Sequence, residues 1–443
     1  MRTTTNLAAP DAQLEQALAI LDQQPRPSVA QRFLRSQVVN TQRDLAALRP
    51  FRPTEFGAGP ASPSAAHIQA ANQLITHLRG RLQTISTVLD HEAERGVAAP
   101  TTANLQAILA HRQAALSRAK AIERIWQFYL ELFGQRQSRF ADMLLGMDRI
   151  ALDCYQAIYT GLGAPRSIPS PAPFSYMETG FTPATYRRGI RLTRLGRNIN
   201  PFPVVQLPNH RLINPWTLGA VHHEVAHNLQ HDLGLWNVVP RQILARLLRA
   251  GAPPAVAQTW ARWHKEIWAD LAGALLGGPG VVVSLLDVLG RTPAAALHFS
   301  PTGVHPTPYL RTLINTELLR RMGFRRQASE LEQLWRRMYP RPEQGNIPRD
   351  MLGAFPEANR LVVDTICYQP HPNLGGKQLA QVFCFDHNHE QITQEAAHRI
   401  AHGVDPGIMP ARFLVGAVRH AFDQQLAPPS QIARNFYGAL SRR

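Results

Sequence analysis

Apolar residues recur with a helical period of three to four positions through most of the chain. The three longest amphipathic runs lie in the N-terminal third and are spaced as in a helical hairpin or bundle. Shorter runs of the same kind continue toward the C-terminus. We therefore expect a mainly α protein, with a helical arm over residues 1–48 that includes 12–21. Further helices are expected near residues 66–94, 101–133, 136–160, 326–339, 357–368, 390–402 and 410–425.

Two segments instead alternate with the period of two that is typical of a strand, residues 189–195 and 202–207. Within the second segment, we expect residues 204–207 to be the edge strand of a small sheet. Pro203 at its start favours this position, because proline has no backbone N–H to donate to a neighbouring strand. The fold class is thus mainly α with a small β-sheet (α+β).

The most informative motif in the chain is His223-Glu224-Val225-Ala226-His227. It lies in a predicted helix that begins after Asn214, a good N-cap followed by proline, and ends at Gly234. Residues four positions apart share one face of a helix, so both imidazoles can converge on one metal ion. Glu224, next to the first ligand, can then reach a metal-bound water as general base.

A catalytic zinc site needs a third protein ligand. His231 lies about 12 Å along the helix axis from His223, too far to share an ion with it. The metzincin pattern requires Gly at 230 and His at 233, and the chain has Gln230 and Leu233. Glu266 is the better candidate. It lies in a second predicted helix, after Pro253-Pro254 and before Gly277-Gly278.

Glu266 is the only glutamate in the chain with an aspartate, Asp270, four positions later. A ligand carboxylate with a second carboxylate one turn away suits a zinc site, because the second can accept the outer ring N–H of a ligand histidine. A solvated pair facing Lys265 and Arg262 is the alternative interpretation.

These two motifs resemble those of the gluzincins, the thermolysin-like zinc metallopeptidases with an HExxH…ExxxD pattern. The resemblance covers roughly residues 185–310. It implies Zn²⁺ held by His223, His227 and Glu266, with Glu224 catalytic and Asp270 supporting His223. The chain departs from the pattern at Lys265, where thermolysin has asparagine, so the resemblance supplies no partner for the outer nitrogen of His227.

The same resemblance implies a later His or Tyr that stabilises the oxyanion. The chemistry requires a donor aimed at the developing tetrahedral oxygen. In the segment His305-Pro306-Thr307-Pro308-Tyr309, His305 is the first choice and Tyr309 the second. The alternative is a Pro-rich turn that begins the next helix, with His305 capping it.

On this basis the chain divides at Pro-rich stretches near residues 50–64 and 165–173. Residues 1–65 would form the helical arm and linker, and 66–173 an N-terminal helical domain. Residues 174–325 would form a zincin-like catalytic core. Residues 326–443 would form a C-terminal α-helical domain that walls the cleft.

A second metal site is a weaker hypothesis. Two cysteines and three histidines near the C-terminus have an order that loosely fits a structural zinc site, although no CxxC is present. The residues are Cys367, His371, Cys384, His387 and His389. A buried thiol is the ordinary explanation for Cys367, because it ends an apolar helical run. The chain has three cysteines and its N-terminus lacks an apolar signal region, so we expect a cytoplasmic protein without disulfides; export by another route stays open.

The formal net charge is +16, but lysine occurs at three positions only, so nearly all of the 47 basic residues are arginine. Such a bias indicates coding composition as much as function. Arginines cluster in residues 187–197 and 320–341, where acidic partners or nucleic acid could bind; solvated helix faces are the default interpretation. The most apolar window, 271–289, contains Gly-Gly-Pro-Gly and an aspartate, so we expect no membrane span.

We therefore expect a zinc-dependent hydrolase, most simply a peptidase acting on a peptide or protein substrate. A catalytically inert zincin-fold scaffold, with the N-terminal helices engaging a partner, is one alternative. A basic nucleic-acid-associated protein is another. The sequence indicates neither the cleavage specificity nor the oligomeric state.

Overall fold

The computed structural model describes residue 15 and residues 27–163, 167–180 and 182–443. The expected helix over 12–21 falls outside this part of the chain, except for Glu15. The fold is mainly helical, with 70% helix and, in the described ranges, one sheet of three strands. This agrees with the mainly α class and small sheet expected from the sequence.

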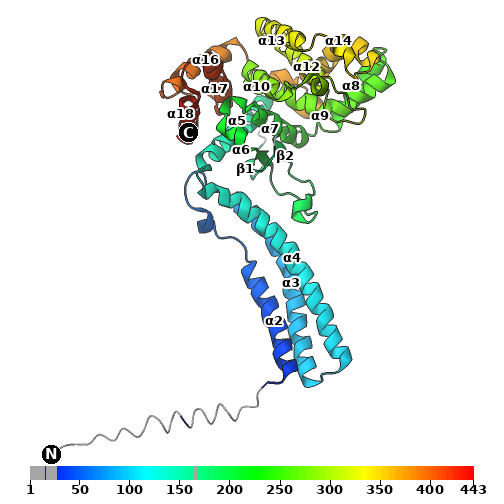
Figure 1. Ribbon diagram of the computed structural model, residues 1–443, viewed down its shortest axis with the longest axis vertical. Helices are drawn as coiled ribbons and strands as arrows, with labels where there is room; N and C mark the ends of the chain where they lie inside the picture. The colour runs from blue at the N-terminus through cyan, green and yellow to red at the C-terminus, as the bar shows by residue number, and fades with distance from the viewer. Residues whose placement is uncertain (1–14, 16–26, 164–166, 181) are drawn as a thin grey trace, which may run out of the picture. The chain divides into compact units, whose positions relative to one another are not determined.

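The described residues form two compact units, one within residues 27–51 and 72–127 and the other within residues 52–71 and 128–443. In the first unit, α2 (Val29–Ala47) lies beside parts of α3 (Ala65–Ala98) and α4 (Thr102–Gly134) (Figure 1). Helix α2 begins at a capping box in which Ser28 and Gln31 bond reciprocally. The unit buries a small apolar cluster of Leu34, Val38, Leu89, Ala93 and Ile108.

The second unit contains the sheet and the remaining long helices. Residues 174–325 and 326–443, expected as separate domains, both lie in this unit. Its helices are α5 (Ala141–Leu162), α6 (Asn209–Ile213), α7 (Gly219–Asp232), α8 (Val238–Arg249), α9 (Pro254–Gly277), α10 (Pro279–Leu289), α11 (Pro293–Ala296), α12 (Pro308–Arg321), α13 (Arg325–Met338), α14 (Arg349–Val363), α15 (Leu379–Val382), α16 (His387–Ala401), α17 (Leu414–Asp423) and α18 (Pro429–Ser441).

The sheet has the order β1-β3-β2. β3 (Val204–Leu207) pairs in parallel with β1 (Phe174–Met177) and antiparallel with β2 (Ala184–Tyr186). The expectation that residues 204–207 form the edge was therefore wrong. All four residues of β3 are buried and have a partner strand on each side. Pro203 is compatible with this place because it precedes the ladder, where its carbonyl accepts from Phe174 N. The edge strand next to α7 is β2.

Residues 189–195 were also expected to be a strand, and this was wrong. Arg191 makes one isolated bridge to Ile199, and a short 3-10 helix, Thr193–Leu195, follows. Glycines with positive φ lie at both ends, Gly189 at +77° and Gly196 at +57°, and turn the chain back on itself. The segment is therefore a short irregular hairpin, in which Gly189 and Leu192 donate to the carbonyls of Asn200 and Asn198 but no regular strand forms.

Helices α7 and α9 pack against each other in the core of this unit (Figure 1). Val221, Val225 and Leu229 of α7 are fully buried, and each such side chain contributes about 1.5–3 kcal/mol by leaving water. Helix α9 begins at Pro254 and ends at Gly277, as expected. It stops because Gly278 has φ +73°, with the Phe385 ring against the position that a Cβ would take.

The apolar window 271–289 is thus the end of α9, a glycine turn and α10. No helix among the described residues is long and apolar enough to cross a membrane.

Candidate metal centre

The start of α7 differs slightly from the expected one. Residues Pro215–Thr217 form a 3-10 turn, and the α-helix begins at Gly219. The Asn214 side chain donates to the carbonyl of His210 and does not cap the helix. The helix ends as expected, since Gly234 has φ +71°. His223, Glu224 and His227 therefore lie in a regular helix.

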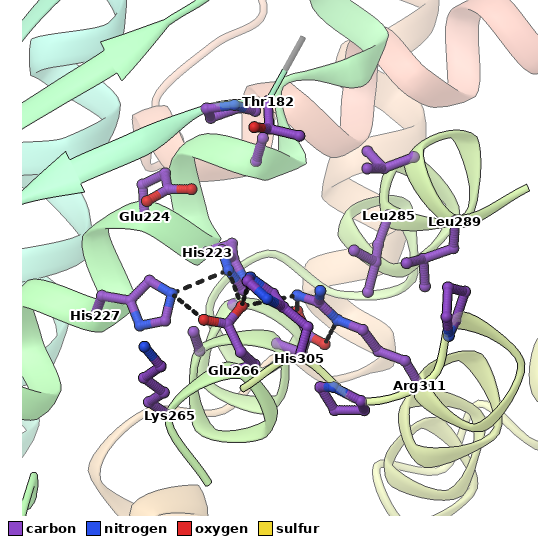
Figure 2. Close-up of a pocket in the computed structure, with 18 of the residues that line it drawn as sticks. Thr182, His223, Glu224, His227, Lys265, Glu266, Leu285, Leu289, His305 and Arg311 are labelled. Atoms are coloured by element: carbon purple, nitrogen blue, oxygen red, sulfur yellow. Dashed lines mark hydrogen bonds and ion pairs between the residues drawn. The ribbon is translucent and has the colours of Figure 1, made fainter. Parts of the chain in front are cut away.

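His223 and His227 of α7 meet Glu266 of α9 (Figure 2). Nε2 of His227 lies 3.1 Å from Nε2 of His223. The Glu266 carboxylate oxygens lie 3.5 Å from Nε2 of His223 and 3.7 Å from Nε2 of His227. Ligands bonded at 2.0–2.1 Å to a tetrahedral ion are separated by about 3.3 Å, so the two imidazole nitrogens and the Glu266 carboxylate fit one metal ion. No other group of this kind forms among the residues that the structure describes.

Asp270 lies on the outer side of His223, one turn after Glu266. Its Oδ1 is 2.8 Å from Nδ1 of His223. A proton held on Nδ1 leaves Nε2 of His223 free to bind a metal ion. The structure thus places Asp270 where the resemblance put it. Nδ1 of His227, by contrast, is buried with neither a hydrogen bond nor an aspartate paired with it among the described residues.

Arg311 of α12 holds Asp270 from the other side, a contact that the sequence analysis missed. Its Nε and Nη2 donate to the two Asp270 oxygens at 2.6 and 2.8 Å, and Asn315 donates to Oδ2 at 3.4 Å. Nη2 also lies 3.6 Å from Glu266. One sequence signal could have indicated this contact: Arg311 and Asn315 lie four positions apart, on one face of a helix that begins at Pro308.

The surroundings of Glu266 and Asp270 favour their ionised forms. Burial alone would raise the pKa of Asp270, but the charge and hydrogen bonds of Arg311, with help from His223, lower it to about 2. For Glu266, burial would raise the pKa, but the hydrogen bond and charge of His223, with the charges of His227 and Arg311, hold it well below its usual range. Two ionised, buried carboxylates create a field that favours a cation.

The two histidines respond differently to this field. Burial, with the charge of His223, lowers the pKa of His227 to about 3, so His227 is the neutral imidazole that a metal needs. At His223, burial is outweighed by Asp270 and Glu266, and the pKa rises to about 10. The surroundings of His223 therefore stabilise a positive charge on or beside its ring.

Glu224 lies on the cavity wall beside the two histidines (Figure 2). Its side chain is buried, and this burial raises its pKa to about 7, although the charge of His223 opposes the shift. A carboxylate with a pKa near neutrality both accepts and returns a proton easily.

The two candidates for oxyanion stabilisation have different surroundings. His305 lies in the loop before α12, lines the cavity, and has Nε2 3.3 Å from Glu266. Tyr309 is buried against Tyr339, with its hydroxyl 3.4 Å from Arg336, and it does not line the cavity. These contacts place Tyr309 on the face of α12 turned toward α13. It is therefore not retained as a site residue.

The centre lies in a cavity of about 810 Å³ lined by residues between 182 and 315. The edge strand β2 forms part of its wall, and Asn228 of α7 fixes that strand by donating to Thr185 at 2.7 Å. The C-terminal helices after residue 325, expected to wall the cleft, contribute no described residue to this cavity. The wall comes mainly from β2, α7, α9, α10, the segment between α10 and α12, and the start of α12.

The C-terminal cysteines and histidines do not form a second metal group within the described ranges. Cys367 is buried and Cys384 exposed. His387 packs against the Phe324 ring, and His389 forms a capping box with Asp386 at the start of α16. His371 is also buried, without joining a group of ligands.

Many arginines of the two clusters have partners within the chain. Arg194 pairs with Glu178, and Arg188 donates to the carbonyls of Pro169 and Pro171. In the second cluster, Arg320 and Arg336 both pair with Glu332, and Arg321 pairs with Glu317 and Asp364. These pairs leave less charge for an acidic partner or nucleic acid than the sequence alone indicates.

No protein-family model, curated protein or solved structure matches this chain. Function is therefore inferred from the chemistry of the candidate metal centre.

The contact between Arg311 and Asp270 leads to the first prediction. Arg311→Ala leaves a buried carboxylate without its cation, and we expect the free energy of unfolding to fall by about 3–5 kcal/mol. Arg311→Lys should recover part of this loss, because lysine keeps the charge but not the two parallel hydrogen bonds. Urea denaturation measures both effects. Arg326→Ala, which removes an exposed pair with Glu330, is the control and should change little. A loss below about 1 kcal/mol for Arg311→Ala would contradict the proposed role of this pair.

Proposed function

We propose that the protein is a zinc-dependent peptidase of gluzincin type. The observation that carries the proposal is that His223 and His227 of α7 lie together with Glu266 of α9. Two imidazoles and one carboxylate are the ligands of a common class of catalytic zinc sites, in which the fourth position is left for water. The contact of Asp270 with His223 adds the outer partner that such sites use.

When bound, zinc lowers the pKa of its water and polarises a carbonyl group. The other parts of the reaction fall to residues of this chain. Glu224, buried and with a raised pKa, accepts a proton from water and later returns it to the leaving amine. His305 donates a hydrogen bond to the oxygen of the tetrahedral species. Arg311 acts through Asp270, keeping the ring of His223 oriented.

Two features favour a peptide as the substrate. Strand β2 lies at the edge of the sheet and lines the cavity, so an extended peptide can pair with its backbone. The cavity is also large enough for several side chains.

The direct test combines metal analysis with peptide turnover. We expect about one zinc per chain, cleavage of peptides from a mixed library, loss of cleavage after chelation, and recovery when zinc is added. Turnover that survives complete removal of the metal would refute the proposal. A protein that binds zinc in the centre and cleaves nothing would favour the inert scaffold instead.

A further inference from the structure

The cavity wall differs in chemistry on the two sides of the metal-binding residues. Figure 2 shows Lys265 beside His227 on one side, and Leu285 and Leu289 of α10 on the other, beyond Arg311. A substrate bound across the centre therefore meets two distinct environments.

The first side is cationic. Arg187 directly follows β2, and its guanidinium lies 3.6 Å from the centre of the Trp236 ring. Trp236 in turn lies edge-on to the ligand His227, with 6.5 Å between ring centres. Lys265 immediately precedes the ligand Glu266. All of these residues line the cavity.

Neither cation has a carboxylate partner within 4.0 Å among the described residues. Asp232, whose charge acts on Arg187 from a distance, accepts a hydrogen bond from Tyr155 at 2.9 Å. The three carboxylates that line the cavity, Glu224, Glu266 and Asp270, all belong to the metal centre. The charges of Arg187 and Lys265 are therefore available to a ligand.

The second side is apolar. Helix α10 lines it with five aliphatic side chains. The aliphatic residues are Val281, Val282, Leu285, Val288 and Leu289. Arg291 lies past the end of the helix, where its Nε donates to the carbonyl of Val288 at 3.3 Å. An aliphatic or aromatic side chain placed here leaves water without losing a hydrogen bond.

We propose that the substrates are peptides with an acidic side chain on one side of the cleaved bond and a large apolar side chain on the other. The acidic group contacts Arg187 and Lys265, and the apolar group packs on α10. The two residues lie on opposite sides of the bond because the metal centre lies between their contact sites. This inference rests on the proposed peptidase function.

The test begins with a mixed peptide library and mass spectrometry of the cleaved ends. We expect Glu or Asp to be enriched within three residues of the bond on one side, and Leu, Ile, Phe or Met on the opposite side. A synthetic pair that differs by Glu against Gln at the acidic position then gives a ratio of kcat/KM values. We expect the ratio to exceed about 10 and to fall with rising salt, as a partly exposed charge contact must.

Variants test the assignment to these residues. Arg187→Gln combined with Lys265→Gln should lower the Glu/Gln ratio at least about 10-fold, whereas Arg187→Lys with Lys265→Arg should keep most of it. Arg291→Gln is the matched control. It removes one positive charge, against two in the double variant, from a cavity residue that follows α10, and should leave the ratio unchanged. An equal fall for both changes would contradict a local contact.

Binding separates this inference from the peptidase proposal. Fluorescein-labelled peptides with Glu or Gln placed two to five residues from a leucine, in both orders, are titrated into the zinc-loaded Glu224→Gln variant. Tighter binding of the Glu peptides that is lost in the Arg187 and Lys265 double variant supports the inference even if the wild type cleaves nothing. Equal dissociation constants for the Glu and Gln peptides would overturn it, even if peptides are cleaved.

Discussion

Replacing Glu224 with glutamine is expected to lower kcat by about 10²–10⁴-fold without loss of the metal ion. Glutamine has nearly the same shape but cannot accept the proton of an attacking water. The three proposed metal ligands, His223, His227 and Glu266, are untouched by the change. Zinc content and peptide turnover, measured on the same preparation, separate the two effects.

Glu357→Gln is the matched control, since Glu357 is an exposed residue of α14 outside the cavity. It should behave as the wild type. If Glu224→Gln retains full turnover, Glu224 is not the general base. If it loses zinc as well as turnover, the residue acts through the metal site and the proposed division of roles is wrong.

The second large effect is expected at the ligands. His223→Ala, His227→Ala and Glu266→Gln should each lower zinc affinity by more than the roughly 10–100-fold that the loss of an outer partner costs. Turnover should fall to background at a zinc concentration that saturates the wild type. Competition with a chromophoric chelator measures the affinity, and circular dichroism checks that the helices persist.

Two further variants give this experiment its contrast. His231→Ala removes another histidine of α7, one that lies outside the ligand group, and should keep zinc. The zinc affinity of Asp270→Asn should lie between that of His231→Ala and those of the ligand variants, with a loss of about 10–100-fold. In this variant the ring of His223 stays in position but loses its carboxylate partner. Full zinc binding by Glu266→Gln would contradict the assignment of the third ligand.

The two helices of the centre were predictable because their signals are local. The spacing of His223 and His227, and the proline and glycine that bound α9, act within a few residues of the chain. Glu266 was selected from the sequence by one relation only, the aspartate one turn later. That relation is also local, since it depends on the period of a single helix.

What could not be predicted depends on contacts between distant segments. Arg311 reaches Asp270 across 41 positions of the chain. Tyr309 was proposed because it follows His305 in the same Pro-rich segment, yet its ring packs against Tyr339 and its hydroxyl accepts from Arg336, away from the cavity. The order of the sheet is a similar case. The pattern of residues 204–207 predicts a strand but not the number of its neighbours, which depends on where residues 174–177 and 184–186 return.

The shortness of β2 has a consequence for how selective the protein should be. A bound chain that runs along only three residues, Ala184–Tyr186, gains few main-chain hydrogen bonds, and those are nearly independent of its sequence. Discrimination then depends on a few side chains, so under the proposed peptidase function we expect cleavage at few sites rather than general digestion of proteins.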